Sequence, residues 1–523
     1  MLKAGFISFI CVSILVASGC QGSKSFLGPA PTVYTKALYS KVLTFDPAMM
    51  TDTASLSVAN QIYDGLLEFG QHSEVLPALA ESWETSRDGK AITFHLRPGV
   101  RFHDGTPVTS ADCVESFERL LANSSVVEKY YDLIQGSDEF RSGVRNRVTG
   151  LEAPTPETFI IRLKNKFPPF VTVLAGATAK ILPHARTKDA NFFQSPVGTG
   201  AFRFVRANDA EVLLTRNEHY WREPARLETL RFLIADESQG IQLAEHGAVQ
   251  DLVTYPFNGD EPIFNQGGQH LQIPVVATWI LGINTRLKPF DRKAVRAQFK
   301  AAFSPEEFVE KFYPGQLPAR GGYIPPGLPG YLASPDVSRM GPSARKMVVR
   351  EPVRLVIPEL LSKAPAMKLY FEEKLRKAGF QSVTVDLASW ENQEARYNAK
   401  TMQAFLMSQN ADYPDPEFLV RNFASNNPDN FSGLHSEKVD RMIEQARETD
   451  SRSERAQLYE KLARVLNDEA LTVNLIHFRA HYWFASCVRG IELNSLGDVY
   501  LPYRKLSLEG DCSPKGPEVA DVR

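Results

Sequence analysis

The stretch FHLRPGVRFHDGTPVT, from Phe94 to Thr109, decides the fold. Its first residues continue a run in which apolar side chains alternate with others, the pattern of a half-buried β-strand. The pairs Pro98-Gly99 and Asp104-Gly105 are turn signals that interrupt this run. We therefore predict a small antiparallel meander over residues 80–108, followed by a helix over residues 111–121.

Residues 353–387 have a different pattern of apolar residues. Residues 353–357 and 383–387 are predicted strands, and the segment between them carries one apolar helical face, made of Met367, Tyr370, Phe371, Leu375 and Ala378. Gly379 stands where a helix would be capped. The order strand, helix, strand predicts a parallel pair joined by a crossover, and so an α/β unit distinct from the meander.

The composition excludes several classes of protein. The chain has 523 residues, with 59 Lys and Arg against 61 Asp and Glu, a formal charge of −2. A nucleic-acid-binding protein needs a surplus of basic residues on one face, and no polybasic run is present. With 43% hydrophobic and 23% charged residues the chain is globular, and its length predicts about two to four structural units.

The N-terminus has the form of an export signal. Met1-Leu2-Lys3 is a short basic start, and the apolar stretch from Phe6 to Val16 is shorter than a spanning helix. The run LVASGC that ends at Cys20 resembles a bacterial lipoprotein box, which implies cleavage before Cys20 and lipid attachment to it. A plain signal peptide near a Cys is the alternative. Residues 20–32 would then form a flexible tether.

Several other segments have distinctive sequences. They are residues 61–67 (QIYDGLL), 76–83 (LPALAESW), 196–202 (PVGTGAF), 217–221 (NEHYW), 284–302, 411–416 (ADYPDP) and 439–443 (VDRMI). In this order, and with the stretch 94–109, they resemble the oligopeptide- and dipeptide-binding proteins of bacterial ABC importers, the family 5 solute-binding proteins. The resemblance covers about residues 33–505.

The resemblance implies a mixed α/β fold of the type II periplasmic-binding-protein class, with two hinged lobes and an added third domain. We assign the ranges as follows: signal peptide 1–19; tether 20–32; lobe I 33–63 with 196–275 and 488–523; added domain 64–195; lobe II 276–487. It implies a monomer, anchored by lipid in the periplasm or at the cell surface, that carries peptides to a permease driven by an ATPase. It implies no cofactor, no metal and no nucleic acid.

The resemblance also implies a ligand site. Asp412 matches the Asp that anchors a ligand's α-ammonium; the alternative is that it caps a turn before Pro414. Trp390 matches a tryptophan of the pocket; the alternative is a tryptophan in the core of the lobe. Ser408, Gln409, Asn410 and Tyr413 would lie along the ligand, although many peptide binders have Trp at the position of Gln409. For the ligand carboxylate, Arg396, Lys400 and Arg421 are nearby candidates, and the choice among them stays open.

Other functions stay open from sequence. Relatives with this fold bind nickel complexes, haem, sugars or antibiotics, and a chaperone or sensor lipoprotein is a further alternative. An exported hydrolase would need reacting groups, but no G-x-S-x-G, H-E-x-x-H or P-loop motif is present. Asp412 and Asp415 fit an acid/base pair or two loop residues. His95 and His103 fit strand and turn positions better than a metal site.

Of the five Cys, Cys11 leaves with the signal and Cys20 is the lipidation site. In an exported protein Cys487 and Cys512 either form a bridge or remain as two free thiols. Cys113 is the odd residue, predicted to be a buried small hydrophobe.

Overall fold

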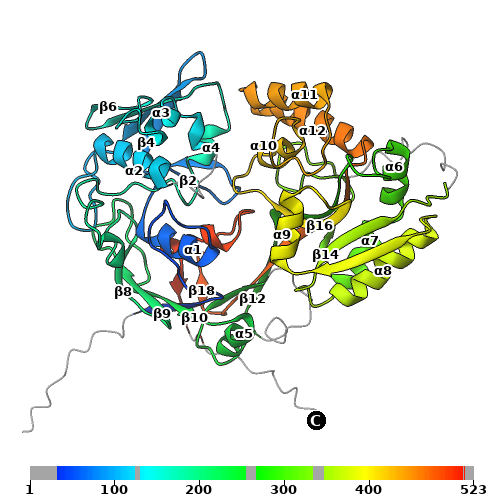
Figure 1. Cartoon of the computed structure of the whole chain (residues 1–523). Coiled ribbons are helices and arrows are strands. Elements are labelled where there is room, and N and C mark those ends of the chain that lie inside the picture. The colour runs from blue at the N-terminus through cyan, green and yellow to red at the C-terminus, as the bar shows by residue number, and fades with distance from the viewer. Residues whose placement is uncertain (1–31, 124–129, 255–266, 334–346, 511, 513–523) are drawn as a thin grey trace, which may run out of the picture.

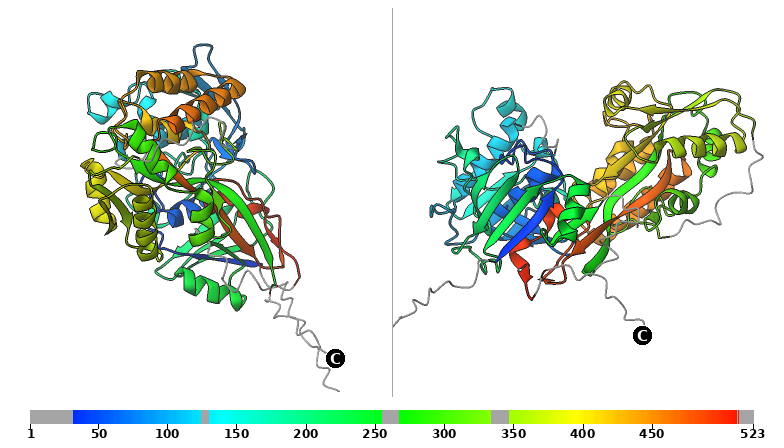
Figure 2. Two further views of the ribbon diagram at one scale, coloured as in Figure 1. Left: turned by 90° about the vertical axis from the view of Figure 1, so that its right-hand side faces the viewer. Right: turned by 90° about the horizontal axis from the view of Figure 1, so that it is seen from below.

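The computed structural model describes residues 32–123, 130–254, 267–333, 347–510 and 512. Two lobes stand side by side and are joined at their base by long strands (Figures 1 and 2). One large sheet runs through both lobes. Its strands, in order, are β15 (Val383–Ala388), β14 (Val353–Pro358), β16 (Ala404–Asn410), β12 (Gln269–Ile283), β17 (Thr472–Phe484), β11 (Asp251–Thr254), β1 (Val33–Leu38), β10 (Thr229–Ile234), β9 (Glu211–Arg216) and β8 (Phe202–Ala207).

Helices cover this sheet and define the lobes. Lobe I is the half of the sheet from β11 to β8 with α1 (Thr53–Ile62) and α5 (Glu237–Glu245). Lobe II is the half from β15 to β16 with α6 (Lys293–Ala301), α7 (Pro305–Phe312), α8 (Ala364–Lys377), α9 (Trp390–Asn398), α10 (Glu417–Val420), α11 (Glu437–Glu448) and α12 (Arg452–Asp468). The short β13 (Leu317–Pro318) pairs with β17.

Strands β12 and β17 connect the two lobes. Residues 481–484 of β17 pair with β11 in lobe I, while residues 277–283 of β12 pair with β16 in lobe II. The ladder between β12 and β17 shifts register between Pro274 and Thr278, where the chain passes from one lobe to the other. Such an irregularity bends a strand locally and interrupts the pairing. The crossing therefore lies near residues 274–278, and the predicted domain ranges stay a prediction.

The predicted strand, helix, strand unit is present in lobe II. β14 and β15 pair in parallel, and α8 lies between them along the chain. Met367, Tyr370, Phe371 and Leu375 are almost fully buried, as the apolar periodicity predicts. Gly379 follows the helix with φ of +101°, a conformation that residues with a Cβ rarely adopt.

The added domain folds around a core of its own, formed by residues between Leu66 and Ile181 together with Ala48 and Tyr413. Its sheet has the order β4 (Ala80–Thr85), β5 (Ala91–Leu96), β7 (Thr158–Arg162) and β6 (Leu151–Thr155), antiparallel throughout. Helix α2 (Ser110–Asn123) packs on it, with α3 (Ser137–Arg141) and α4 (Phe170–Val173) nearby. The helix predicted over residues 111–121 is confirmed, but the meander predicted over residues 80–108 is only the hairpin of β4 and β5, and the next strand of the sheet is β7.

A small hairpin, β2 (Leu67–Phe69) and β3 (Val75–Pro77), links α1 to this domain. Near the C-terminus, β18 (Val488–Arg489) pairs with β19 (Ser507–Leu508). Cys487 and Cys512 are joined by a disulfide that ties this last segment to lobe I, and Cys113 is buried and free. Cys11 and Cys20 lie outside the described residues.

Four of the sequence segments that carry the family resemblance, residues 61–67, 94–109, 196–202 and 217–221, meet where the added domain joins lobe I. The ring of His103 contacts the backbone of the 198–200 turn on both sides: Gly198 N–H donates to Nδ1 at 3.2 Å, and Nε2 lies 2.9 Å from the Gly200 carbonyl oxygen. Burial lowers the pKa of His103 to about 4, so this histidine is neutral near pH 7. It holds two chain segments together and is not positioned as a metal ligand.

The same turn lies against the end of α1. A Cβ on Gly198 would stand 2.1 Å from the carbonyl oxygen of Ile62, so no side chain fits there. Next to it, Trp221 Nε1 donates to Asp64 at 2.8 Å, and the Tyr220 hydroxyl donates to the same carboxylate at 3.3 Å. The sequences of these segments are thus explained by their place in a structural junction that fixes the added domain on lobe I.

Candidate functional site

A cavity of about 630 Å³ lies between the lobes. Lobe I, the added domain and lobe II all contribute to its walls. The lining residues are Met50, Thr51, Thr53, Leu56, Tyr131, Val173, Gly176–Thr178, Val275–Ala277, Trp279, Ser408, Asn410–Tyr413, Phe478 and Ser495–Tyr500. A volume of this size is typical of sites that bind small molecules.

The lobe II wall is the end of β16. Side chains alternate along a strand, so Ser408 and Asn410 face the cavity while Gln409 points the other way. The Gln409 side-chain oxygen accepts hydrogen bonds from the Tyr323 hydroxyl at 2.9 Å and from Asn422 at 2.8 Å. Ser408 Oγ donates to Asn410 Oδ1 at 2.8 Å. Gln409 is therefore held within lobe II, outside the cavity lining.

Along this wall the end of β16 has no second strand partner among the described residues, although the Ser408 carbonyl oxygen accepts a hydrogen bond from the Gln409 side-chain amide at 3.1 Å. β14 pairs with β16 at its beginning, through Leu355 and Val356 opposite Ala404 and Phe405. Residues 407–410 extend beyond that pairing, while on their other side they are bonded to β12. An extended peptide can add to a strand edge of this kind through main-chain hydrogen bonds.

Asp412 follows directly after β16 and is exposed into the cavity. The preceding Ala411 N–H donates to the Val276 carbonyl at 2.8 Å, which continues the pairing with β12 up to this point. In the described part of the structure Asp412 forms no ion pair. Its carboxylate is thus accessible for a cationic group of a ligand.

Buried ion pairs hold the chain just beyond Asp412. Asp415 pairs with Arg455 at 3.0 Å and accepts a hydrogen bond from the Tyr459 hydroxyl at 3.0 Å. Burial raises the pKa of Asp415, and the attraction of Arg455 opposes this effect. Asp415 is therefore a structural residue, and only Asp412 of the two aspartates lines the cavity.

Tyr413 extends this support to the added domain. Its hydroxyl donates to Glu417 Oε2 at 2.6 Å, and Glu417, which is fully buried, pairs with Arg447 at 3.2 Å. The ring of Tyr413 also packs edge to face against Tyr130, with 5.2 Å between centroids. The turn that carries Asp412 is thus fixed from lobe II and from the added domain.

The other predicted site residues lie outside the cavity lining. Trp390 begins α9 and is 60% exposed, and Arg396 on the same helix pairs with Asp386 at 3.5 Å. Arg421 stacks on the rings of Tyr130 and Phe418, at 4.5 and 4.6 Å. Lys400 stacks on Tyr397 at 4.5 Å. The structure thus brings Ser408, Asn410, Asp412 and Tyr413 together in the cavity lining. That Gln409, Trp390 and Arg396 contact the ligand stays a prediction.

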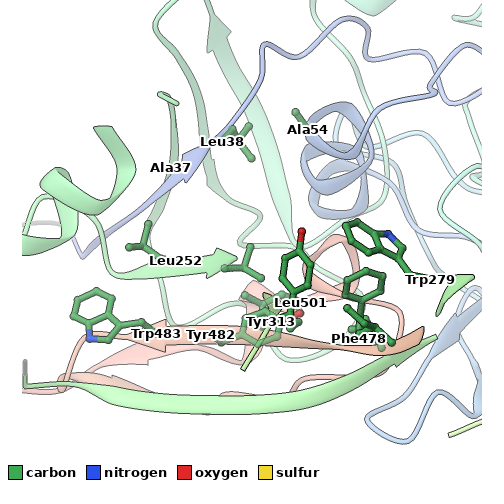
Figure 3. Close-up of a cluster of buried hydrophobic side chains, with 14 of the residues drawn as sticks. Ala37, Leu38, Ala54, Leu252, Trp279, Tyr313, Phe478, Tyr482, Trp483 and Leu501 are labelled. Atoms are coloured by element: carbon green, nitrogen blue, oxygen red, sulfur yellow. The ribbon is translucent and has the colours of Figure 1, made fainter. Parts of the chain in front are cut away.

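Sequence reasoning missed the aromatic wall. Trp279 on β12 and Phe478 on β17 meet edge to face (Figure 3), with 5.3 Å between ring centroids. Both residues line the cavity. Tyr500 reaches the opposite wall, where its hydroxyl accepts the Ala177 N–H at 3.1 Å. These residues come from distant parts of the chain, and the only signal for Trp279 was its place in a long apolar strand.

A second carboxylate in the lining was also missed. Asp498 begins a single 3-10 turn, Asp498–Tyr500, and is 8% exposed. Its Oδ2 lies 3.3 Å from the ammonium of Lys36 on β1, which also contacts Asp251 Oδ2 at 3.1 Å. One buried lysine, Lys36, therefore pairs with two carboxylates, and one of them, Asp498, lies in the cavity wall.

No metal site is evident in the part of the chain that the structure describes, since no three His, Cys, Asp or Glu side chains gather there to hold an ion. Over the same residues, no helix is both long enough and apolar enough to cross a membrane.

Two lobes that enclose a cavity, joined by long crossing strands and tied by an added domain, define a ligand-binding protein of the hinged two-lobe class. Residues 74–431 match the model of the bacterial extracellular solute-binding proteins, family 5. The chain belongs to this family, which confirms the predicted family and fold class.

Known proteins with similar sequences align with most of this chain. A di/tripeptide-binding protein of Pseudomonas aeruginosa is 28% identical, over 83% of this chain and 87% of its own. The dipeptide-binding protein of Escherichia coli is 24% identical, over 87% and 90%. The structure of Haemophilus influenzae OppA in complex with the peptide RPPGFSPFR superposes with a TM-score of 0.72 at 19% identity, covering 92% of this chain and 100% of that one.

Proposed function

We propose that this chain is the extracytoplasmic substrate-binding component of an ABC importer and that it captures peptides in the cavity between its lobes. The observation that carries the proposal is the position of Asp412, an accessible carboxylate placed directly at the end of an available strand edge. The edge suits the backbone of an extended peptide, and the carboxylate suits the ammonium that begins it. The peptide-binding relatives named above support the same ligand class.

Transport follows from closure of the lobes. A ligand that contacts both walls stabilises the closed form, because its binding energy depends on both lobes being near it. The closed, loaded protein then delivers the peptide to a permease coupled to an ATPase. Under this proposal the chain is a monomer outside the cytoplasm, held at the membrane by a lipid on Cys20. No reacting group is required of it.

Mass spectrometry of ligands released from the purified, denatured protein tests this function. We expect peptides to be released, and none after exhaustive unfolding and refolding in peptide-free buffer. The emptied protein should then take up one peptide per chain from a mixture of short peptides. Release of haem, a sugar or a nickel complex, with no uptake from the peptide mixture, would contradict the proposal.

Tryptophan fluorescence should report on the cavity directly. Of the five tryptophans, all described, Trp279 is the one that lines the cavity, and it is 8% exposed. Peptide binding is expected to change its surroundings, and Trp279→Phe should remove most of the spectral change. The matched variant Trp483→Phe, buried in lobe I, should retain it. A change that persists in Trp279→Phe and vanishes in Trp483→Phe would place the ligand elsewhere.

A further inference from the structure

The charged side chains of the cavity wall are two carboxylates. Asp412 lies just after the end of β16, and Asp498 begins the 3-10 turn Asp498–Tyr500, which follows β17 and β18 in the chain. Over the described residues of the lining no lysine, arginine or histidine is present. A ligand enclosed here therefore meets negative charge from both sides of the cavity.

The surroundings of Asp498 leave a negative charge in excess. Lys36, Asp251 and Asp498 are all buried, and the ammonium of Lys36 contacts both carboxylates. When both aspartates are ionised, one positive charge faces two negative ones. Tyr503 donates to Asp251 Oδ2 at 3.4 Å, and the Tyr34 hydroxyl also interacts with the Asp251 carboxylate, whose pKa is raised by burial. A buried excess of charge is costly unless another group compensates it.

Aromatic rings line the same space and favour cations as well. Tyr131, Trp279, Tyr413, Phe478 and Tyr500 contribute to the lining. The face of an aromatic ring attracts an ammonium or guanidinium group, most strongly where water is excluded. Carboxylates and aromatic rings together form the usual surroundings of a bound organic cation.

Cations are found in a neighbouring space instead. Tyr500 also lines a smaller cavity of about 90 Å³ that contains Lys180, Arg504 and Lys505. Two of these side chains already have partners: Arg504 lies 3.4 Å from Glu68, and Lys505 pairs with Glu492. Three carboxylates, Asp64, Glu68 and Glu492, line that smaller cavity as well, so its charges balance, whereas the charged residues described in the lining of the main cavity are carboxylates alone.

We propose that the cavity selects peptides that carry a second cationic group, a lysine or arginine side chain, in addition to the α-ammonium. Asp412 receives the α-ammonium, and Asp498 receives the side-chain cation and compensates the excess charge around Lys36. This inference rests on the proposed function, because it names the class of peptide that the same cavity takes.

Calorimetry with matched tripeptides tests the selection. The probes are Lys-Ala-Ala, Ala-Lys-Ala and Ala-Ala-Lys, each compared with the peptide that has norleucine in place of lysine. Norleucine keeps the four-carbon aliphatic chain and lacks the terminal ammonium group. We expect at least one lysine peptide to bind about tenfold more tightly than its norleucine partner, as for one charge-assisted contact.

Variants assign this preference to Asp498. In Asp498→Asn the lysine and norleucine peptides should bind within about twofold of each other. This variant should fold, because Lys36 and Asp251 remain as a neutral pair. Glu448→Gln removes an exposed carboxylate from α11, outside the cavity lining, and should keep the preference.

Each outcome is decisive. Equal or tighter binding of all three norleucine peptides by the natural protein would overturn the inference while leaving peptide binding intact, whether or not the variant folds. A preference that survives in Asp498→Asn would overturn the role of Asp498. Failure of every peptide to bind would overturn the proposed function, and the inference with it.

Discussion

Lys36→Met is expected to destabilise the protein by about 3–5 kcal/mol, the cost of leaving buried charges without their partner. Lys36 is 2% exposed and lies 3.1 Å from Asp251 and 3.3 Å from Asp498. Burial alone lowers the pKa of this lysine, but the two carboxylates outweigh that effect and raise it above its usual range. Methionine keeps the volume of the side chain but removes the charge.

Urea unfolding followed by circular dichroism measures this effect. Lys41→Met is the matched control, because Lys41 pairs with Asp209 at the surface, where such pairs contribute little. We expect its unfolding curve to coincide with that of the natural protein. Adding Asp251→Asn and Asp498→Asn to Lys36→Met should recover much of the lost stability. An unchanged midpoint in Lys36→Met alone would show that Lys36 does not stabilise the two buried carboxylates.

Asp412→Asn is expected to weaken the binding of peptides with a free N-terminus by about 10- to 100-fold. A hydrogen bond to a charged group contributes about 1.5–3 kcal/mol, and each 1.4 kcal/mol is a factor of ten in affinity. Asparagine keeps the shape of the side chain and loses its charge. Because Asp412 is exposed and forms no ion pair among the described residues, the substitution should leave stability unchanged.

Calorimetric titration with trialanine measures the loss, and thermal unfolding checks the fold. The variant should bind N-acetyl-trialanine as the natural protein does, since that peptide has no ammonium to lose. Equal affinity of the two proteins for trialanine would remove Asp412 from the proposed role.

Local patterns predicted much of the fold. The apolar face from Met367 to Leu375 identified α8, and the alternation before Pro98 identified the antiparallel sheet of the added domain. In both cases the signal lies within a few residues and depends on one element packing against one surface. The arrangement of two hinged lobes with an added domain was predicted from the family resemblance instead. The crossing of β12 and β17 joins segments about two hundred residues apart.

The cavity was predictable only in part. Asp412, Ser408, Asn410 and Tyr413 follow one another in the chain, so a single motif located them. The alternation of a strand could have shown that Gln409 faces away from its two neighbours. Trp279 and Asp498 could not be found this way. Asp498 pairs with Lys36, and this contact between β1 and a 3-10 turn more than 400 residues later is encoded by no local pattern.

The most direct test of the account compares trialanine with N-acetyl-trialanine on the natural protein and on Asp412→Asn, by calorimetry at pH 7. Acetylation removes the ammonium and leaves the peptide backbone intact. We predict that the natural protein binds trialanine at least about tenfold more tightly than the acetylated peptide, and that Asp412→Asn abolishes this difference. Equal binding of both peptides by the natural protein, or binding of neither, would contradict the central claim that the cavity holds peptides by their free N-terminus at Asp412.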